Sequence, residues 1–303
     1  MYSGREEKLL GPIIDRFQEA TGIQVGVKYG KNASLVATIQ EEGKNSPADI
    51  FFGSDPGSLG ALEERLVPLP EEILNKVPSQ FRSRQGRWVG ISGRSRVVVY
   101  NTERLTEADL PQSILDFTDP KWEGRIGWAP TNGSFQSFVT ALRKLEGDGV
   151  ARQGLEGIQA NDPKVYSKNT PIVKAVADGE IEVGFVNHYY LFRFLAEEGE
   201  GFAARNYYPT GGDAGAVVLV AGAGIVDTSK NKEAAERFLD FMMSIVAQEY
   251  FASETFEYPL VDGVDTPPGL LPLSEIQVPD VDLSQLADLE TTVDLLRDTG
   301  VLP

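Results

Sequence analysis

Short apolar runs alternate with helical patterns along this chain, which restricts it to an α/β fold. Residues 23–29 alternate like a strand, residues 34–42 repeat like a helix, and residues 50–52 form a second apolar run. Strand, helix, strand is the βαβ unit of a parallel sheet, which places ligands at the carboxyl ends of its strands. Ser54 and Asp55 follow the second run, so we expect them to cap a helix at such an edge.

A helix is also expected before these elements. Apolar residues recur at helical spacing from Leu10 to Phe17, and Gly22 is positioned to end the helix. Glu6 and Glu7 lie in its first turn, where the helix dipole favours acidic side chains. A glycine-containing loop therefore leads into a helix N-terminus.

The second half of the chain repeats this alternation. The indicated elements are extended segments at 88–92 and 96–100, strands at 125–129, 181–186 and 216–224, and helices at 135–145, 171–177 and 232–246. Their order predicts two α/β lobes joined by two crossings, an arrangement that hinges around a ligand. We expect lobe one to comprise residues 1–98 and 221–275, lobe two residues 99–220, and the C-terminal segment 276–303 to pack on lobe two.

Length, net charge and the absence of cysteine exclude several classes of function. A chain of 303 residues suggests about two domains of about 150 residues each. The net charge of −17 would repel nucleic acids and anionic lipid surfaces, and it favours a cationic ligand. The absence of cysteine removes thiolate metal sites and thiol nucleophiles. No apolar run approaches the length of about 18 residues that a membrane span needs.

Two adjacent tyrosines, Tyr189 and Tyr190, follow a short apolar strand. Asn187 is a suitable cap for the helix that comes next, so both tyrosines are expected in its first turn. Neighbouring side chains there lie only about 100° apart, and two phenols can reach one cation. Aromatic packing at the end of an element is the alternative, and the pair Tyr207 and Tyr208 illustrates how common such a signal is.

Three further segments at strand ends could bind an anion. The loop 131–134 offers small side chains and free backbone N–H groups at a helix N-terminus. Arg94 has the planar donor fork that matches an oxyanion such as carbonate, although an ordinary ion pair is an equal alternative. Asn169 and Asn187 are amides before helices, where capping is the usual role. Two tyrosinates, a carbonate and one arginine would together balance the charge of Fe3+, which prefers hard oxygen donors.

Several runs resemble those of bacterial ferric-binding proteins. They are W-V-G-I-S-G-R-S-R-V-V-V-Y-N (88–101), G-R-I-G-W-A-P-T-N-G-S-F (124–135), Y-S-K-N (166–169) and D-G-E-I-E-V-G-F-V-N-H-Y-Y (178–190), with Y-S-G-R near the start and P-A-D-I-F-F in lobe one. Proteins of that family are periplasmic substrate-binding components of iron(III) ABC importers. The resemblance implies a type II periplasmic-binding fold, with a ligand cleft between two lobes.

The resemblance also implies roles for individual residues. Tyr189 and Tyr190 match the paired iron ligands, whereas Tyr207 and Tyr208 have no counterpart. The positions that match the family's anion-binding residues are Arg94, Asn132, Gly133, Ser134, Asn169 and Asn187.

Departures from the family pattern fall mainly in lobe one. Glu6 stands where many members have a histidine or tyrosine, Ser54 where some have a glutamate, and Phe135 where others have a tyrosine. Glu6 is either an iron ligand or simply an acid at a helix start. Ser54 and Asp55 remain candidates for anion binding. For His188 a structural role is favoured over ligation.

These observations predict an extracytoplasmic iron(III) receptor that binds Fe3+ with a synergistic anion, carbonate or bicarbonate, and delivers it to an ABC permease. We expect a monomer without catalytic activity or affinity for nucleic acid, in the periplasm or at the outer cell surface. Met1 directly precedes Tyr2 in what resembles the end of a first strand, so we expect a mature form that lacks its leader.

Two other functions stay open. One is a protein of the same fold that binds an organic or phosphonate anion without metal. The other is an enzyme on a related fold, but a chain with no cysteine and a single histidine is poorly supplied for acid–base or nucleophilic chemistry.

Overall fold

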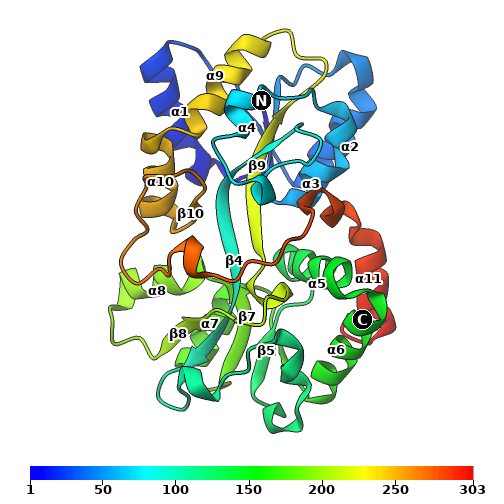
Figure 1. Ribbon diagram of the computed structural model, residues 1–303, viewed down its shortest axis with the longest axis vertical. Helices are drawn as coiled ribbons and strands as arrows, with labels where there is room; N and C mark the ends of the chain where they lie inside the picture. The colour runs from blue at the N-terminus through cyan, green and yellow to red at the C-terminus, as the bar shows by residue number, and fades with distance from the viewer. Residues whose placement is uncertain (303) are drawn as a thin grey trace. The chain divides into compact units, whose positions relative to one another are not determined.

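The computed structural model describes residues 1–302, and the chain forms two compact units (Figure 1). Unit 1 comprises residues 1–93, 219–270 and 282–287. Unit 2 comprises residues 94–218, residues 271–281 and the chain from Asp288 onward. Each unit combines strands with covering helices, which confirms the expected α/β class. Within residues 1–302, no helix is long and apolar enough to cross a membrane.

The sheet of unit 1 is built around the first strand. Strand β1 (Tyr2–Ser3) pairs in parallel with β2 (Lys28–Tyr29) and β3 (Ile50–Gly53), and β3 pairs in antiparallel with β9 (Val218–Ile225). Figure 1 shows α1, α9 and α10 on one side of this sheet and α2 and α3 on the other. The helices and the last strand of the unit are α1 (Glu7–Thr21), α2 (Asn32–Glu42), α3 (Pro56–Ala61), α4 (Glu71–Leu74), α9 (Lys232–Met242), α10 (Ile245–Thr255) and β10 (Tyr258–Pro259).

Helix α1 forms where the sequence predicts it. Its buried face runs from Leu10 to Phe17 at helical spacing, and Phe17 meets the ring of Phe238 edge to face, with the ring centroids 5.2 Å apart. Gly22 ends the helix with a φ of 73°, a left-handed conformation that costs glycine little.

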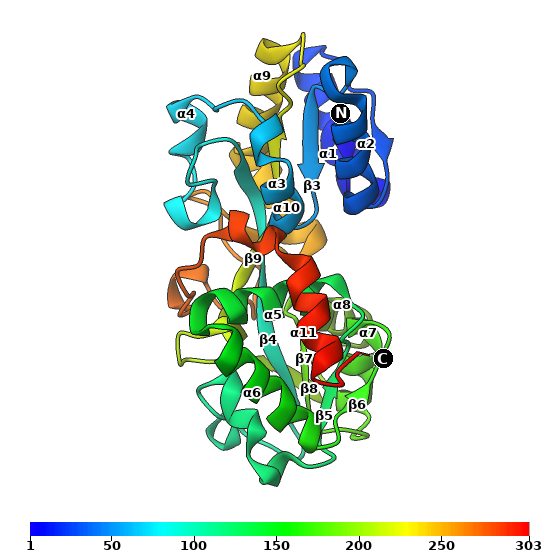
Figure 2. The same cartoon turned by 90° about the vertical axis from the view of Figure 1, so that its right-hand side faces the viewer.

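The sheet of unit 2 is built on the long strand β4 (Val89–Asn101), which begins in unit 1. Strand β7 (Val183–Asn187) and strand β8 (Ala204–Tyr207) pair with it in antiparallel, and Arg96 lies opposite Asn187. On the other edge of β7 lie β5 (Ile126–Trp128) and β6 (Lys164–Val165) in parallel. The helices of the unit are α5 (Gly133–Glu146), α6 (Asp148–Ala160), α7 (Asn169–Ala177), α8 (Tyr189–Glu198) and α11 (Leu289–Asp298); Figure 2 shows α5, α6 and α11 from the side.

The structure corrects three expectations about elements. The two extended segments at 88–92 and 96–100 form one continuous strand, β4. The helix expected at 232–246 ends at Met242, because Ser244 accepts a hydrogen bond from the backbone N–H of Ala247 and caps a new helix, α10. The helix after Asn187 is not capped by that side chain: Asn187 ends β7, its amide oxygen faces Arg96, and His188 occupies the N-cap position.

The C-terminal part of the chain is divided between the units. Residues 282–287 belong to unit 1, where they pack on α3, and the chain from Asp288 belongs to unit 2, where α11 packs on α5. This division differs from the expectation from the sequence, in which residues 276–303 all pack on lobe two. Crossings into and out of unit 2 fall at 93/94 and 218/219, a few residues before the positions expected from the sequence.

Candidate metal and anion site

Tyr189 and Tyr190 form the first turn of α8, directly after β7. Their ring centroids are 4.3 Å apart and the ring planes are tilted by 32°. Tyr189 is buried and Tyr190 is half-buried. The guanidinium carbon of Arg193, one turn later, lies 4.8 Å and 5.5 Å from the centroids of the two rings. Both tyrosines therefore lie in the first turn of a helix, as the sequence predicts, and the structure adds the positive charge of Arg193 beside them.

Arg96 is the arginine that the structure places beside this pair. It extends from β4, its side chain is buried, and one terminal nitrogen donates to Asn187 Oδ1 at 3.0 Å and to Ser134 Oγ at 3.4 Å. Burial lowers the pKa of Arg96 to about 10, whereas the nearby Tyr189 and Tyr190 act in the opposite direction. Arg96, the tyrosines and the start of α5 therefore belong to one site.

Sequence reasoning selected Arg94 and missed Arg96. Arg94 is the first residue of unit 2 and is half-buried on the same strand. Residues two apart on a strand share a face, so the spacing R-S-R within β4 is a signal that could have indicated both arginines. Two observations distinguish them: the register of β4 against β7 sets Arg96 opposite Asn187, and Arg96 is buried whereas Arg94 is half-buried.

The loop before α5 is the candidate anion site. Asn132 is the N-cap, and its Oδ1 accepts from the backbone N–H of Ser134 at 3.0 Å and from Ser134 Oγ at 2.7 Å. Ser134 Oγ in turn accepts from Asn169 Nδ2 at 3.2 Å. Gly133 leaves the surroundings of its Cα open, because a Cβ there would meet no heavy atom within 4 Å. Free N–H groups of a helix first turn attract anions, and Arg96 adds a full positive charge.

One polar atom of this network has no partner. Asn169 is only 1% exposed, yet its Oδ1 makes no hydrogen bond. An unsatisfied buried carbonyl costs about 1–3 kcal/mol, which a proton-bearing ligand or a bound water would relieve. The predicted residues Asn132, Ser134, Asn169 and Asn187 are thus connected through shared hydrogen bonds in unit 2.

A cation at this site would depend on the phenols. Within residues 1–302, no three histidine, aspartate or glutamate side chains gather in a group able to hold a metal ion. His188 lies beside the tyrosines, but its Nδ1 accepts from the backbone N–H of Ser95 at 3.1 Å and its ring packs edge-on against Tyr189. The donors that remain in this part of unit 2 are oxygens, which suit a hard trivalent cation.

The candidate residues of unit 1 have structural partners of their own. Glu6 lies at the N-cap of α1, its side chain is 67% exposed, and it pairs with Lys8 at 2.9 Å. Asp55 caps α3 through the backbone N–H of Ser58 at 2.8 Å. Asn32 donates to both Asp55 and Ser54, the latter at 2.8 Å.

Gly4 packs tightly behind this group. A Cβ atom at Gly4 would lie 1.5 Å from Asn32 Oδ1. The loops that follow β1, β2 and β3 are therefore held together at the carboxyl ends of the three strands, with Glu6 exposed beside them.

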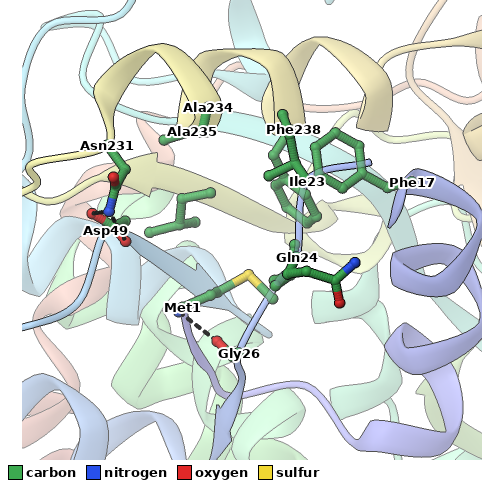
Figure 3. Close-up of a pocket in the computed structure, with 12 residues that line it drawn as sticks. Met1, Phe17, Ile23, Gln24, Gly26, Asp49, Asn231, Ala234, Ala235 and Phe238 are labelled. Carbon is green, nitrogen blue, oxygen red and sulfur yellow. Dashed lines mark hydrogen bonds between the residues drawn. The ribbon is translucent and has the colours of Figure 1, made fainter. Parts of the chain in front are cut away.

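Figure 3 shows a separate pocket of about 240 Å³ in unit 1. Phe17, Ile23 and Phe238 line it, and the amino group of Met1 donates to the backbone oxygen of Gly26 at 2.8 Å. The pocket lies at the amino ends of β1 and β3, at the opposite end of these strands from Ser54. It contains none of the predicted site residues.

Comparison with known proteins gives the family. The profile of the bacterial extracellular solute-binding proteins matches residues 45–283. The chain belongs to this family. A relative in Neisseria meningitidis, the major ferric iron-binding protein, is 35% identical over 306 residues, which cover 99% of this chain and 92% of the relative. The Fe(3+)-binding periplasmic protein of Serratia marcescens is 33% identical and covers 100% of this chain and 90% of its own length.

Solved structures of family members have the same fold. Iron-bound HitA from Pseudomonas aeruginosa superposes with a TM-score of 0.88 at 35% identity, over 99% of this chain and 98% of HitA. FutA from Trichodesmium, in complex with iron and citrate, gives a TM-score of 0.89 at 30% identity over the same shares. The periplasmic-binding fold and the resemblance to ferric-binding proteins, both expected from the sequence, are confirmed.

Proposed function

We propose that this protein is an extracytoplasmic receptor that captures Fe3+ with a small anion and delivers it to an ABC importer. The observation that carries the proposal is the adjacent pair Tyr189 and Tyr190 beside the buried guanidinium of Arg96. The names of the relatives in Neisseria and Serratia support ferric iron as the cargo and the periplasm as the location.

The two phenols are the proposed protein ligands. Trivalent iron stabilises the phenolate form, so each tyrosine releases its proton when the metal binds. Two phenolates leave one positive charge on the ion, and a bound anion completes the coordination. Glu6, exposed at the start of α1, is a further proposed ligand from unit 1.

The proposed anion site consists of Arg96, the first turn of α5 and the amides around it. Asn132, Gly133 and Ser134 supply the loop, and Asn169 and Asn187 flank it. Carbonate fits a guanidinium fork and free helix N–H groups, and its protonated form, bicarbonate, would also supply a donor for Asn169 Oδ1. Arg94, Ser54 and Asp55 remain predicted contributors. Citrate is the competing anion, because the FutA structure contains it with iron.

A binder of an organic or phosphonate anion without metal is the alternative function. The network of Arg96 and the α5 loop would serve such an anion as well. Anion binding gives no reason for two phenols to lie side by side in the first turn of α8, whereas iron binding does. We therefore favour the iron receptor, with transport and not catalysis as its role.

An absorption spectrum separates the two functions. Fe3+ added with bicarbonate to the iron-free protein should produce a visible phenolate-to-iron band that saturates at one ion per chain. Omission of bicarbonate should weaken the band, and citrate in its place tests the competing anion. A protein that binds phosphonate or citrate but stays colourless with Fe3+ would contradict the proposal.

A further inference from the structure

The C-terminal tail passes between the two units three times. Residues 271–281 belong to unit 2, residues 282–287 to unit 1, and the chain from Asp288 again to unit 2. We propose that the segment 282–288 is a tether that limits how far the two units can separate, and that it thereby slows release of the bound ion. The statement about ion release rests on the proposed function, whereas the tether itself does not.

A glycine face of α3 holds the tether in unit 1. A Cβ atom at Gly57 would lie 2.6 Å from the backbone oxygen of Leu286, and one at Gly60 would lie 2.1 Å from that of Ser284. Leu283 and Leu286 are buried there. No side chain fits between this helix and the segment, so the two backbones are in direct contact.

Buried hydrogen bonds reinforce this attachment. Ser284 Oγ accepts from Trp88 Nε1 at 3.1 Å and donates to Glu63 Oε1 at 3.0 Å. Glu63 is itself buried and accepts a further bond from Ser83. A buried polar group that loses its hydrogen-bond partner costs free energy. Detachment of Ser284 would leave both Trp88 Nε1 and Glu63 Oε1 without this partner.

In unit 2 the tether ends on Arg143, which extends from α5. The guanidinium is almost fully buried and donates to Asp288 Oδ2 and to the backbone oxygen of Asp288, both at 3.3 Å, and to Thr292 Oγ1 at 2.9 Å. Lys144 adds an ion pair with Asp288 at 2.9 Å, and Thr140 bonds Thr292 at 2.8 Å. The first turn of α11 is thus fixed to α5.

The two attachments leave almost no slack. Leu286 is held by unit 1 and Asp288 by unit 2, with one residue between them. A chain spans at most about 3.3–3.6 Å per residue. The units can therefore rotate about this point, but they can separate there by only a few ångströms unless one attachment breaks.

The test uses Gly60→Ala, which places a methyl group against the tether. Gly11→Ala is the matched control, because a Cβ there meets only Glu7 Cγ, at 3.8 Å, within α1 of the same unit. The chain has no cysteine, so fluorophores on Glu41→Cys and Glu146→Cys, exposed in unit 1 and unit 2, report the distance between units without background labelling.

We expect Gly60→Ala to broaden the single-molecule distance distribution of the iron-free protein and Gly11→Ala to leave it unchanged. Iron release to a chelator should accelerate at least about fivefold, the lower end of typical coupling between distant sites. The proposal is wrong if hydrogen exchange shows that residues 282–287 have detached in Gly60→Ala and the distance distribution is nevertheless that of the unsubstituted protein. If Gly60→Ala does not fold, Ser284→Ala provides the same comparison. If Gly60→Ala broadens the distance distribution but the unsubstituted protein does not bind iron, the tether is supported and the proposed function is rejected.

Discussion

At the residue scale, the oxygen atoms of two phenols are the features on which the function depends. Tyr189→Phe and Tyr190→Phe keep the rings, whose centroids are 4.3 Å apart, and remove only the donor atoms. We expect each change to abolish most of the iron-dependent colour with little effect on folding. The measurement is a titration with Fe3+ and bicarbonate, followed by absorbance and circular dichroism.

Tyr207→Phe is the control for this prediction. Tyr207 and Tyr189 are both 8% exposed and both belong to unit 2, so the same chemical change is made in equally buried rings. Colour should persist in the control. Equal losses at positions 189 and 207 would show that the phenols of α8 have no special role in binding.

Substitution of Arg96 gives a second prediction at this scale, for iron and anion binding and for the free energy of unfolding. Arg96→Met should weaken iron and anion binding by about 10- to 100-fold, as expected for loss of a charged hydrogen bond. Stability should fall by about 1–3 kcal/mol, because the buried Oδ1 of Asn187 loses its hydrogen-bond donor. Calorimetric binding and chemical unfolding measure the two effects. Arg94→Met is the comparison, and a larger binding loss there would identify Arg94 as the anion ligand.

At the scale of elements, the sequence predicts helices with an apolar face on a polar background, but not a helix whose exposed and buried faces are both mixed in polarity. Helix α1 keeps its apolar residues on one face, which the sequence reveals. Helix α10 exposes the apolar side chains of Ile245 and Val246 and buries the polar Gln248 and Thr255, so its sequence shows no apolar helical stripe. Strand β4 was divided in two at Gly93 because local pattern does not show that paired neighbours on both sides of the glycine keep it extended.

The candidate site was predictable for a different reason. The tyrosine pair is one short stretch of sequence and the α5 loop is another, so a local motif identifies each of them. Arg96, Asn169 and Ser134 meet only through strand register and helix placement, which local patterns do not encode. Local patterns therefore identify Arg94 and not Arg96, and the predicted role of Arg94 is tested by the comparison of Arg94→Met with Arg96→Met.

The cap of α10 supplies a prediction about an element. Ser244→Ala removes the side chain that accepts from the N–H of Ala247 at 3.3 Å, which should cost about 1 kcal/mol and lower the melting temperature by a few degrees. Ser253→Ala is the control, since this serine lies on the exposed face of the same helix and its hydroxyl only bonds back to the oxygen of Glu249. Thermal unfolding by calorimetry compares the two. Equal melting temperatures would mean that the cap contributes nothing.

At the scale of the whole molecule, iron should be released at a pH where the fold is intact. Free tyrosine has a pKa of about 10, so each phenolate at neutral pH exists only through the metal, and protons displace the ion as pH falls. We expect the colour to vanish between about pH 8 and about pH 4 while the far-ultraviolet dichroism stays constant. Loss of colour and loss of helical signal at one common pH would contradict this mechanism.

Asp288 indicates where acid begins to weaken the fold. The hydrogen bond from Thr291 contributes most, and with Lys144 and Arg143 it lowers the pKa of this carboxyl to about 2. Because the folded-state pKa is depressed, the stabilisation is complete above the ordinary value of about 3.9 and disappears as pH falls through about 2. This window lies below the range expected for iron release.

The close contact between Gly4 and Asn32 has a consequence for the history of the protein. With 1.5 Å between a virtual Cβ and the amide oxygen, any side chain at position 4 would require that of Asn32 to move away from Ser54 and Asp55. Glu6 and Glu7, by contrast, have exposed side chains, so other residue types fit at these positions. Among descendants of a common ancestor, positions 4 and 32 should therefore be inherited together or replaced together.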